Sequence, residues 1–450
     1  MKHAQLAALG LFDARVPRYT SYPPATAFSA ETGVDFQESR IKALNPADPV
    51  SVYVHIPFCE RLCWFCACRT QGTSSISPVI RYLDTLKKEL DRLRHLRPFG
   101  LRMGRLHWGG GTPTILPPDM IRDLAAAIMD VIPPATDFEF SVEIDPTMVD
   151  AGKIAALADA GMTRASIGIQ DFAPDVQNAI GRHQSFAQTK TCVDLLRAAG
   201  ITSLNADLVY GLPHQTIAKM GASIDQVLSL DPDRIALFGY AHVPHMAKRQ
   251  KLIKEETLPD DVARHELSEM ATARFVQAGM VEIGIDHFAK PKDSLAIAAH
   301  TSTLRRNFQG YTVDSCPTLI GIGASSISRF ADGYVQNAAA TAAYIERINA
   351  GQLSGHRGVA MTRQDEMRAR AIEMIMCDFA VDLTELRATY GEMAADLDPD
   401  IEKVMNRFGT VIQRHEDGFQ ITEHARHVAR LIARCFDTYD IAAAIYSRAS

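Results

Sequence analysis

Four cysteines fall within ten residues near the start of the chain, and their spacing suits metal chemistry. The segment reads CERLCWFCAC from Cys59 to Cys68, a C-x3-C-x2-C-x-C pattern that directly follows a β-rich run. A compact loop can direct three thiolates at three irons of a cubane cluster and leave the fourth iron open to a small molecule. The pattern therefore predicts a reactive iron–sulfur site.

A structural zinc site is the alternative for these cysteines. Zinc in such sites takes four ligands, commonly in two short pairs that are distant in sequence, and the chain offers no second pair. Four ligands within ten residues would be sterically tight, which favours the cluster. We expect the four scattered cysteines to be buried hydrophobic residues; they are Cys192, Cys316, Cys377 and Cys435.

The composition is that of a globular protein with a large core. Of 450 residues, 47% are hydrophobic and 22% are charged. No apolar run reaches the ~20 residues that cross a bilayer, and no secretory leader is recognisable, so we expect a cytoplasmic protein without a membrane span. The net charge of -6 supplies no broad basic surface and argues against general nucleic-acid binding.

The elements that must position the cysteine loop are strands alternating with helices, which predicts a parallel sheet. Helical periodicity is clearest over residues 79–96 and 187–200. The β-rich runs are SVYVHI from Ser51, RLHW from Arg105, FEFSVEI from Phe138, ASIGIQ from Ala165, NADLVYG from Asn205 and RIALFGYA from Arg234.

Periodicity alone does not separate an open doubly wound sheet from a barrel. Polar or glycine residues stand at or just beyond the carboxyl ends of four runs: Gly109 to Gly111, Glu143, Gln170 and Asp207. Because barrel enzymes place their chemistry at that end, we predict a partial (β/α)6 TIM-like barrel in the α/β class.

Three domains are expected. Residues 1–45 form an N-terminal arm, residues 46–360 the barrel with its extension, and residues 361–450 a small, mostly helical domain of winged-helix type. The last part contains a hairpin turning at Asp417-Gly418 and ends in a helix from His424 to Asp440.

The cysteine motif after the first strand resembles that of the radical S-adenosylmethionine (SAM) superfamily, and GGGTP from Gly109 is similar to its glycine-rich loop. Nearly the whole chain further resembles the oxygen-independent coproporphyrinogen III oxidases. The matching segments are PRYTSYPPA from Pro17, SIGIQDF from Ser166, NADLVYGLP from Asn205, YAHVP from Tyr240, IDHFAKP from Ile285, RNFQGYT from Arg306 and GIGASSIS from Gly321. Cys68 and the PRYTSYPPA arm distinguish the chain from the related haem-binding chaperones, which are the main alternative. Another radical enzyme, such as a methyltransferase, is a further one.

The resemblance implies a set of site residues. Cys59, Cys63 and Cys66 would ligate a [4Fe–4S] cluster, and Cys68 would be a free catalytic residue, with packing as its alternative. Positions for a first SAM molecule are Tyr53, Gly110, Glu143 and Ile327. Positions for a second SAM molecule are Phe65, Gly111, Thr112, Gln170, Arg182, Asp207 and Ala241. For Gln170 and Asp207 the alternative is a polar network at the barrel mouth, and for Arg182 it is a solvated side chain.

The resemblance also implies the reaction. A 5′-deoxyadenosyl radical would abstract hydrogen from the β-carbon of a propionate, and loss of an electron and carbon dioxide would leave a vinyl group, twice per coproporphyrinogen III. The four substrate carboxylates call for basic residues. Candidates are Arg18, Lys248, Arg249, Lys290, Arg305 and Arg306, whereas structural roles are expected for His55, His107, His242 and His287.

The remaining expectations concern partners and the arm. The electron would come from a donor such as flavodoxin or a ferredoxin-type reductase, and the protein is expected to be a monomer. The early arm could fold over the site and exclude water, because a primary radical attacks the nearest C–H bond.

Overall fold

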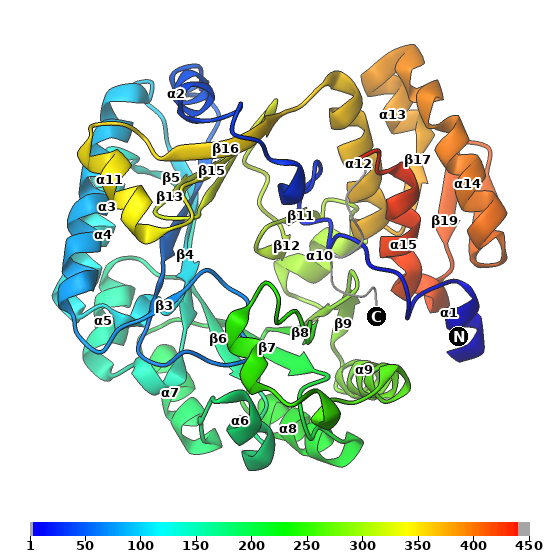
Figure 1. Ribbon diagram of the computed structural model, residues 1–450, viewed down its shortest axis with the longest axis horizontal. Helices are drawn as coiled ribbons and strands as arrows, with labels where there is room; N and C mark the ends of the chain where they lie inside the picture. The colour runs from blue at the N-terminus through cyan, green and yellow to red at the C-terminus, as the bar shows by residue number, and fades with distance from the viewer. Residues whose placement is uncertain (1–2, 440–450) are drawn as a thin grey trace.

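The computed structural model describes residues 3–439 and arranges them around one twelve-stranded sheet (Figure 1). All six predicted β-rich runs are strands, and they pair side by side, in parallel and in chain order. They are β1 (Val50–Ile56), β4 (Met103–Gly110), β5 (Pro134–Ile144), β6 (Arg164–Gln170), β7 (Ser203–Tyr210) and β8 (Arg234–Gly239). A doubly wound sheet would reverse its order in the middle. The unbroken order confirms the partial barrel.

Helices cover the outer side of these strands (Figure 1). The predicted helix over residues 79–96 is α3 (Ser77–Leu96), and the one over 187–200 is α7 (Phe186–Ala198). The others are α4 (Pro118–Val131), α5 (Ala151–Asp159), α6 (Pro174–Ile180) and α8 (Ile217–Ser229). A reciprocal capping box between Ser185 and Gln188 fixes the start of α7. Because the six strands are parallel, the loop that follows each strand opens at the same end of the barrel.

Both edges of the barrel sheet carry short strands that the sequence patterns did not predict. A further parallel strand, β13 (Thr318–Ile322), pairs with β1 and leads into antiparallel β14 (Ile327–Phe330), β15 (Gly333–Asn337) and β16 (Gly355–Ala360). Antiparallel β10 (His287–Ala289) and β9 (Val281–Ile283) extend the sheet beyond β8. Beside them lie α9 (Asp261–Gln277), α10 (Ser294–His300), α11 (Thr341–Asn349) and the hairpin of β11 (Arg305–Asn307) and β12 (Gly310–Thr312).

A buried carboxylate ties the extension to the barrel. Glu89 on α3 is 2% exposed and accepts hydrogen bonds from the Tyr344 hydroxyl at 2.6 Å, the Gly323 N–H at 2.8 Å and the Asn337 amide at 2.9 Å. Burial raises the pKa of Glu89 to about 7, although these three donors act to lower it. The same carboxylate holds the loop that leads to Ile327.

Stability is expected to fall as pH rises because of Glu89. Its pKa is raised above its ordinary value of 4.5 in the folded state, so folding favours the protonated form. The stabilisation that Glu89 gives the folded state is fully present below about pH 4.5. As pH rises through about 7 it is lost, which lowers the free energy of unfolding by on the order of 3 kcal/mol. Glu89→Gln should flatten this part of a denaturant-unfolding profile against pH, and the exposed helix residue Asp91→Asn should leave it unchanged. An unaltered slope in Glu89→Gln would contradict the assignment.

The C-terminal part has the helices and three-stranded sheet of a winged-helix arrangement. Its elements are α12 (Arg363–Cys377), β17 (Ala380–Asp382), α13 (Leu383–Tyr390), α14 (Asp398–Phe408), β18 (Ile412–His415), β19 (Gly418–Ile421) and α15 (Ala429–Ala433). The predicted hairpin exists, but its two loop residues are Glu416 and Asp417, because Gly418 already pairs with His415.

The prediction of one long helix from His424 is wrong. Of the described residues 424–439, only those of α15 are α-helical, and 3₁₀ segments flank it at Glu423–Val428 and Arg434–Phe436. In the first 3₁₀ segment the two buried residues, Ala425 and Val428, stand three positions apart, which matches the period of a 3₁₀ helix. The predicted end at Asp440 lies outside the described residues.

The start of the N-terminal arm packs mainly with the C-terminal part, and Phe12 also contacts His265 of α9. The arm includes α1 (His3–Ala8), and Figure 1 places this helix near α15. Leu6, Phe12 and Tyr19 belong to the same hydrophobic cluster as Phe436. Arg430 donates to the carbonyls of Val16 and Pro17 at 2.6 and 3.2 Å.

The arm then runs to α2 (Val34–Lys42), whose Ile41 joins the barrel core. The domain boundaries at 45/46 and 360/361 stay a prediction. Within residues 3–439, no helix is long and apolar enough to cross a membrane.

Candidate functional site

The cysteine loop is closed at its base, at the carboxyl end of β1. Cys59 lies on β2 (Phe58–Cys59), which pairs in parallel with β3 (Gln71–Gly72). The Trp64 N–H donates to the Ile180 carbonyl at 2.8 Å and fixes the far side of the loop to α6. Cys59, Cys63 and Cys66 are half-buried and Cys68 is exposed. The loop thus presents its thiols at the barrel mouth.

Two arginines flank these thiols. The Arg182 Nη1 lies 3.5 Å from the Cys63 Sγ and 3.3 Å from a carboxylate oxygen of Asp145. Arg249 donates to the Thr70 hydroxyl at 2.8 Å and the Cys68 carbonyl at 3.4 Å. The Arg182 Nε and Arg249 Nη1 are buried without a hydrogen-bond partner among the described residues. Two guanidinium groups therefore lie beside the thiols, and one of them is paired with Asp145.

This environment favours the thiolate form of Cys66, whereas burial raises the pKa of Cys59 to about 11. A hydrogen bond with Cys68 is the main cause that lowers the pKa of Cys66 to about 6, and the charges of Arg249 and Arg182 add to it. Over residues 3–439, no three His, Cys, Asp or Glu side chains converge as ligands of one metal ion. A cubane needs its thiolates spread around several irons instead. An all-thiol donor set flanked by two guanidinium groups fits such a cluster.

The glycine run packs directly against the base of the cysteine loop. Gly110 has φ +108, and a Cβ there would collide with the His55 ring. The N–H groups that follow are engaged: Gly110 donates to Glu143, Gly111 to the Ile56 carbonyl and Thr112 to the Phe58 carbonyl. The run brings backbone close to the loop, but its N–H groups already have partners.

Glu143 is the central acceptor of the first predicted SAM site. Its carboxylate takes the Gly110 N–H at 3.1 Å and lies 3.3 Å from the His107 Nε2. Burial acts to raise the pKa of Glu143, but the hydrogen bond and charge of His107, together with Gly110, lower it overall. The side chain stays 42% exposed toward the barrel mouth. An ionised acceptor is thus held ready for a cationic or N–H group.

Tyr53 and Ile327 border the same place. The Tyr53 ring stacks on His107 with centroids 5.7 Å apart, and its hydroxyl lies 3.1 Å from His55 Nδ1. Tyr53 pairs with Gly321 on β13, and a Cβ on Gly321 would meet the Ile327 backbone at 2.8 Å. The structure thus brings all four residues of the first predicted site to one end of β1, β4, β5 and β14.

The second predicted set divides into two groups. Asp207 accepts from Ser166 at 3.1 Å and Asn205 at 2.7 Å, and burial and then Glu143 raise its pKa to about 6. A Cβ on Gly168 would meet the Gln170 amide at 3.1 Å and Arg182 Nη2 at 3.2 Å, so these two side chains converge. Arg182 is only 12% exposed, and the solvated alternative is therefore wrong.

Phe65 and Ala241 are joined by a residue that the sequence analysis missed. The Gln250 amide donates to the carbonyl of Phe65 at 2.8 Å and to that of Ala241 at 3.1 Å, which ties the cysteine loop to the loop after β8. No pattern in the sequence pointed to Gln250. Asp145, the partner of Arg182, was also missed, although its place directly after β5 was a usable signal.

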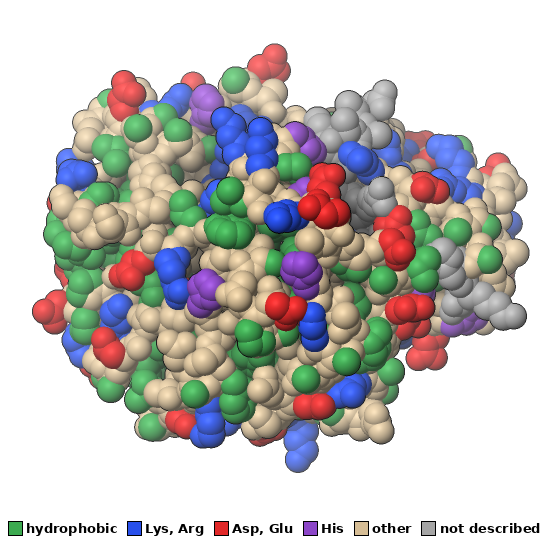
Figure 2. Space-filling model, turned by 60° about the horizontal axis from the view of Figure 1, so that its bottom comes forward, with side chains coloured by type: hydrophobic (Ala, Val, Ile, Leu, Met, Phe, Trp, Pro, Cys, Tyr) green, Lys and Arg blue, Asp and Glu red, His purple; other side chains and the backbone are tan. Residues whose placement is uncertain are grey.

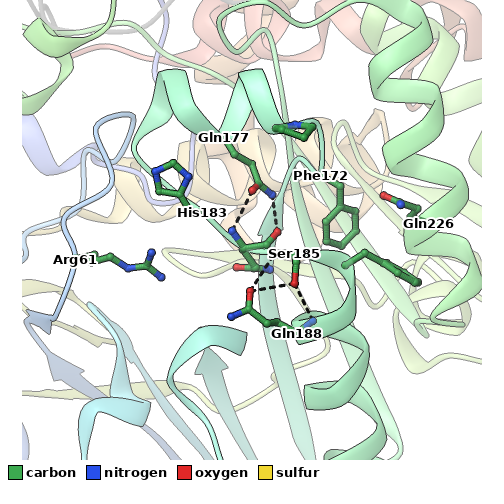
Figure 3. A pocket seen from close by; sticks show the side chains of 10 residues that line it. Arg61, Phe172, Gln177, His183, Ser185, Gln188 and Gln226 are labelled. Carbon is green, nitrogen blue, oxygen red and sulfur yellow. Dashed lines mark hydrogen bonds between the residues drawn. The ribbon is translucent and has the colours of Figure 1, made fainter.

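A hollow of about 530 Å³ lies outside the mouth, beside Arg61 of the cysteine loop (Figure 3). Gln177 of α6, labelled in Figure 3, donates to the Gln184 carbonyl at 2.6 Å and accepts from the Gln184 N–H at 3.0 Å. These bonds fix the short loop that carries Arg182. The residues that line the hollow thus help to support the cysteine loop.

The basic residues predicted to bind the substrate carboxylates lie in different parts of the structure. Arg18 and Arg306 line a cavity of about 540 Å³ at the ends of β7 and β8. Lys290 pairs with Asp231 and Asp233 at the opposite end of β8, so its assignment is wrong. Arg305 instead lies 3.7 Å from Glu373. Arg249 belongs to the cysteine loop, and Lys248 stands before it outside the cavity lining.

The four histidines have partners, as expected for structural residues. His55 and His107 contact Tyr53 and Glu143, respectively, while His242 contacts Glu255 and His287 contacts Asp286. On the face in Figure 2, Lys and Arg lie interspersed with Asp and Glu among the coloured residues. That face therefore forms no continuous basic surface.

Comparisons with known proteins agree with this geometry. A family model described as the radical SAM superfamily matches residues 53–227. The chain is 60% identical over 448 residues to coproporphyrinogen III oxidase, anaerobic 1, of Cereibacter sphaeroides, with 99% of each chain covered. It is 51% identical to the oxygen-independent coproporphyrinogen III oxidase of Paracoccus denitrificans, covering 100% of this chain and 99% of that one. The solved structure of coproporphyrinogen III oxidase from Escherichia coli, described as a radical SAM enzyme, superimposes with a TM-score of 0.90 at 35% identity, covering 94% of this chain and 98% of that one.

Proposed function

Because the chain belongs to the oxygen-independent coproporphyrinogen III oxidases of the radical SAM superfamily, we propose that it converts two propionates of coproporphyrinogen III into vinyl groups, giving protoporphyrinogen IX. The observation that carries the proposal is the thiol loop at the barrel mouth of a chain so similar to these enzymes over its whole length. The haem-chaperone alternative has no support among these relatives.

We assign the cluster to Cys59, Cys63 and Cys66. When bound, the cluster and SAM supply the radical that removes a hydrogen from the propionate. The protein's part is to hold and shield. Arg182 and Arg249 offset the negative charge of the thiolates, and Gln250 fixes the loop against the segment after β8. Cys68, exposed and not needed as a ligand, is left to face the reacting molecules.

Glu143 would accept a hydrogen bond from the amino group or ribose of the first SAM, with Tyr53, Gly110 and Ile327 around it. A carboxylate that is held ionised and open at the mouth suits a cationic amino group. The second SAM would lie between two groups of residues. These are Phe65, Gly111, Thr112 and Ala241 on one side, and Gln170, Arg182 and Asp207 on the other.

The arm and the C-terminal part would close the substrate space. Leu11 and Arg18 of the arm and Arg430 of the C-terminal part line the cavity of about 540 Å³. A closed cavity protects a reactive radical from water and stray C–H bonds. The electron would come from a flavodoxin or a ferredoxin-type reductase. We place the protein in the cytoplasm as a monomer, where a reducing environment protects the thiols.

An anaerobic turnover assay tests the proposal. Reconstituted protein is given a reductant, SAM and coproporphyrinogen III, and porphyrins and 5′-deoxyadenosine are separated by chromatography. We expect protoporphyrinogen IX together with 5′-deoxyadenosine. If 5′-deoxyadenosine forms without a vinyl product, the substrate assignment is wrong. Tight haem binding without turnover would instead favour the chaperone.

A further inference from the structure

Arginines from segments far apart in the sequence meet in the cavity of about 540 Å³. They are Arg15 and Arg18 of the arm, Arg264 of α9, Arg306 of β11 and Arg430 of α15. The cavity also includes Ala241 and His242, and Gln250 ties Ala241 to the cysteine loop. It therefore adjoins the candidate site on one side and reaches the C-terminal part on the other.

Three of these residues, Arg18, Arg306 and Arg430, form what we call the arginine cluster. The Arg306 Nη2 donates to the Arg18 carbonyl at 3.3 Å, and Arg430 donates to the carbonyls of Val16 and Pro17 just before it. The Arg18 side chain is exposed, and its guanidinium donates to the Gly239 carbonyl at 3.4 Å. Three positive groups thus gather around one short stretch of the arm.

Arg306 is the most enclosed member of the cluster. Its side chain is 9% exposed and lies 4.3 Å from the Tyr311 ring centroid. Its Nε and Nη1 have no hydrogen-bond partner among residues 3–439. Burying a guanidinium without a full set of acceptors costs free energy, so an anion that supplies the missing acceptors would stabilise Arg306.

The negative groups in the cavity do not balance the cluster. Asp286 faces the cluster and is hydrogen-bonded to His287 at 2.6 Å; burial acts to raise its pKa, but His287 and then Arg306 and Arg18 lower it to about 2, so one ionised carboxylate faces three arginines. Glu255 lies 3.1 Å from His242, and Asp261 is the third acidic residue in the lining. Burial is the main cause that lowers the pKa of Arg430 to about 10, and the charges of Arg18 and Arg306 add to it.

We propose that the arginine cluster binds the two propionates of the tetrapyrrole that survive the reaction. This inference rests on the proposed function and deepens it. The two surviving carboxylates lie on neighbouring pyrroles, so one group of guanidiniums can hold both through charge-assisted, bidentate hydrogen bonds. The reacting propionates then point toward Ala241 and the cysteine loop at the other side of the cavity. The arm and the C-terminal part thereby select the substrate and set which side of the ring reacts.

Binding of two porphyrins tests the inference. Coproporphyrin III carries four propionates, and mesoporphyrin IX keeps only the surviving pair, with ethyl groups at the two reacting positions. Fluorescence titrations would compare the reconstituted wild type with Arg18→Gln and Arg306→Lys. The matched control is Arg305→Gln, since Arg305 neighbours the cluster but lies near Glu373. We expect each cluster variant to weaken the binding of both porphyrins by roughly 10-fold or more, and the control by less than 2-fold.

Three results separate the possible failures. Unchanged binding of both porphyrins by both cluster variants would overturn the inference, as would weaker binding of coproporphyrin III alone, because the cluster would then hold reacting propionates. Iron content and thermal unfolding of each variant show whether it is intact, and the exposed Arg18 keeps the test valid if Arg306→Lys folds poorly. If the wild type itself neither binds coproporphyrin III nor forms a vinyl product, the proposed function fails instead.

Discussion

Cys63→Ala is expected to give a folded protein that lacks its cluster and makes no product. Three thiolates must hold three irons, and the loop offers only Cys68 as a substitute, at a different position and beyond Cys66. We expect the broad visible absorption, the iron and sulfide content and the protoporphyrinogen formed to be lost together. Turnover should fall by at least ~100-fold, the upper range seen even for residues that merely support a metal ligand.

The matched control for this variant is Cys68→Ala in the same loop. Because Cys68 is assigned a place among the reacting molecules and not on the cluster, this variant should keep its iron and sulfide while losing activity. Loss of the cluster in Cys68→Ala and its retention in Cys63→Ala would reverse the ligand assignment.

Arg182→Met is expected to lower the free energy of unfolding by about 3 kcal/mol. The Arg182 guanidinium is 12% exposed and faces Asp145, which is 18% exposed, at 3.3 Å. Removing one partner of such a largely buried pair leaves an uncompensated charge, and the cost of that charge is the source of the loss. Anaerobic denaturant unfolding, followed by circular dichroism, measures it. Iron content is recorded in parallel, since Arg182 also contacts the Cys63 thiol.

A double variant shows whether the charge is the cause. Asp145→Asn together with Arg182→Met removes both charges, so it should recover much of the stability lost in Arg182→Met alone. If Arg182→Met unfolds within about 0.5 kcal/mol of the wild type, the pair of Arg182 and Asp145 contributes no more than a surface ion pair and the predicted loss is wrong.

The barrel could be predicted because each of its strands and helices is visible in a short, continuous stretch of the sequence. Each parallel strand is a continuous β-rich run and each helix a separate periodic stretch, so SVYVHI and residues 79–96 reveal β1 and α3 without any long-range contact. The cysteine loop is local as well. The outer strands, such as β9 and β10 with three residues each, are too short to show a period.

Long-range pairing could not be predicted in the same way. Lys290 and Arg306 were equal candidates in the sequence, because neither neighbourhood shows which acids face it. Tertiary structure gives Lys290 two aspartates and leaves Arg306 in a cavity with two buried nitrogens that have no hydrogen-bond partner in the described part of the chain. The packing of the arm against the C-terminal part is another example, since Leu6 and Phe436 stand at opposite ends of the chain.

The step that defines the proposed activity is the removal of a hydrogen atom from the propionate β-carbon of coproporphyrinogen III. Its most direct test is a turnover with substrate deuterated at the propionate β-carbons, followed by mass spectrometry of the 5′-deoxyadenosine. We predict that the nucleoside gains deuterium in step with the formation of protoporphyrinogen IX. Vinyl product accompanied by 5′-deoxyadenosine without deuterium would contradict hydrogen removal from this carbon.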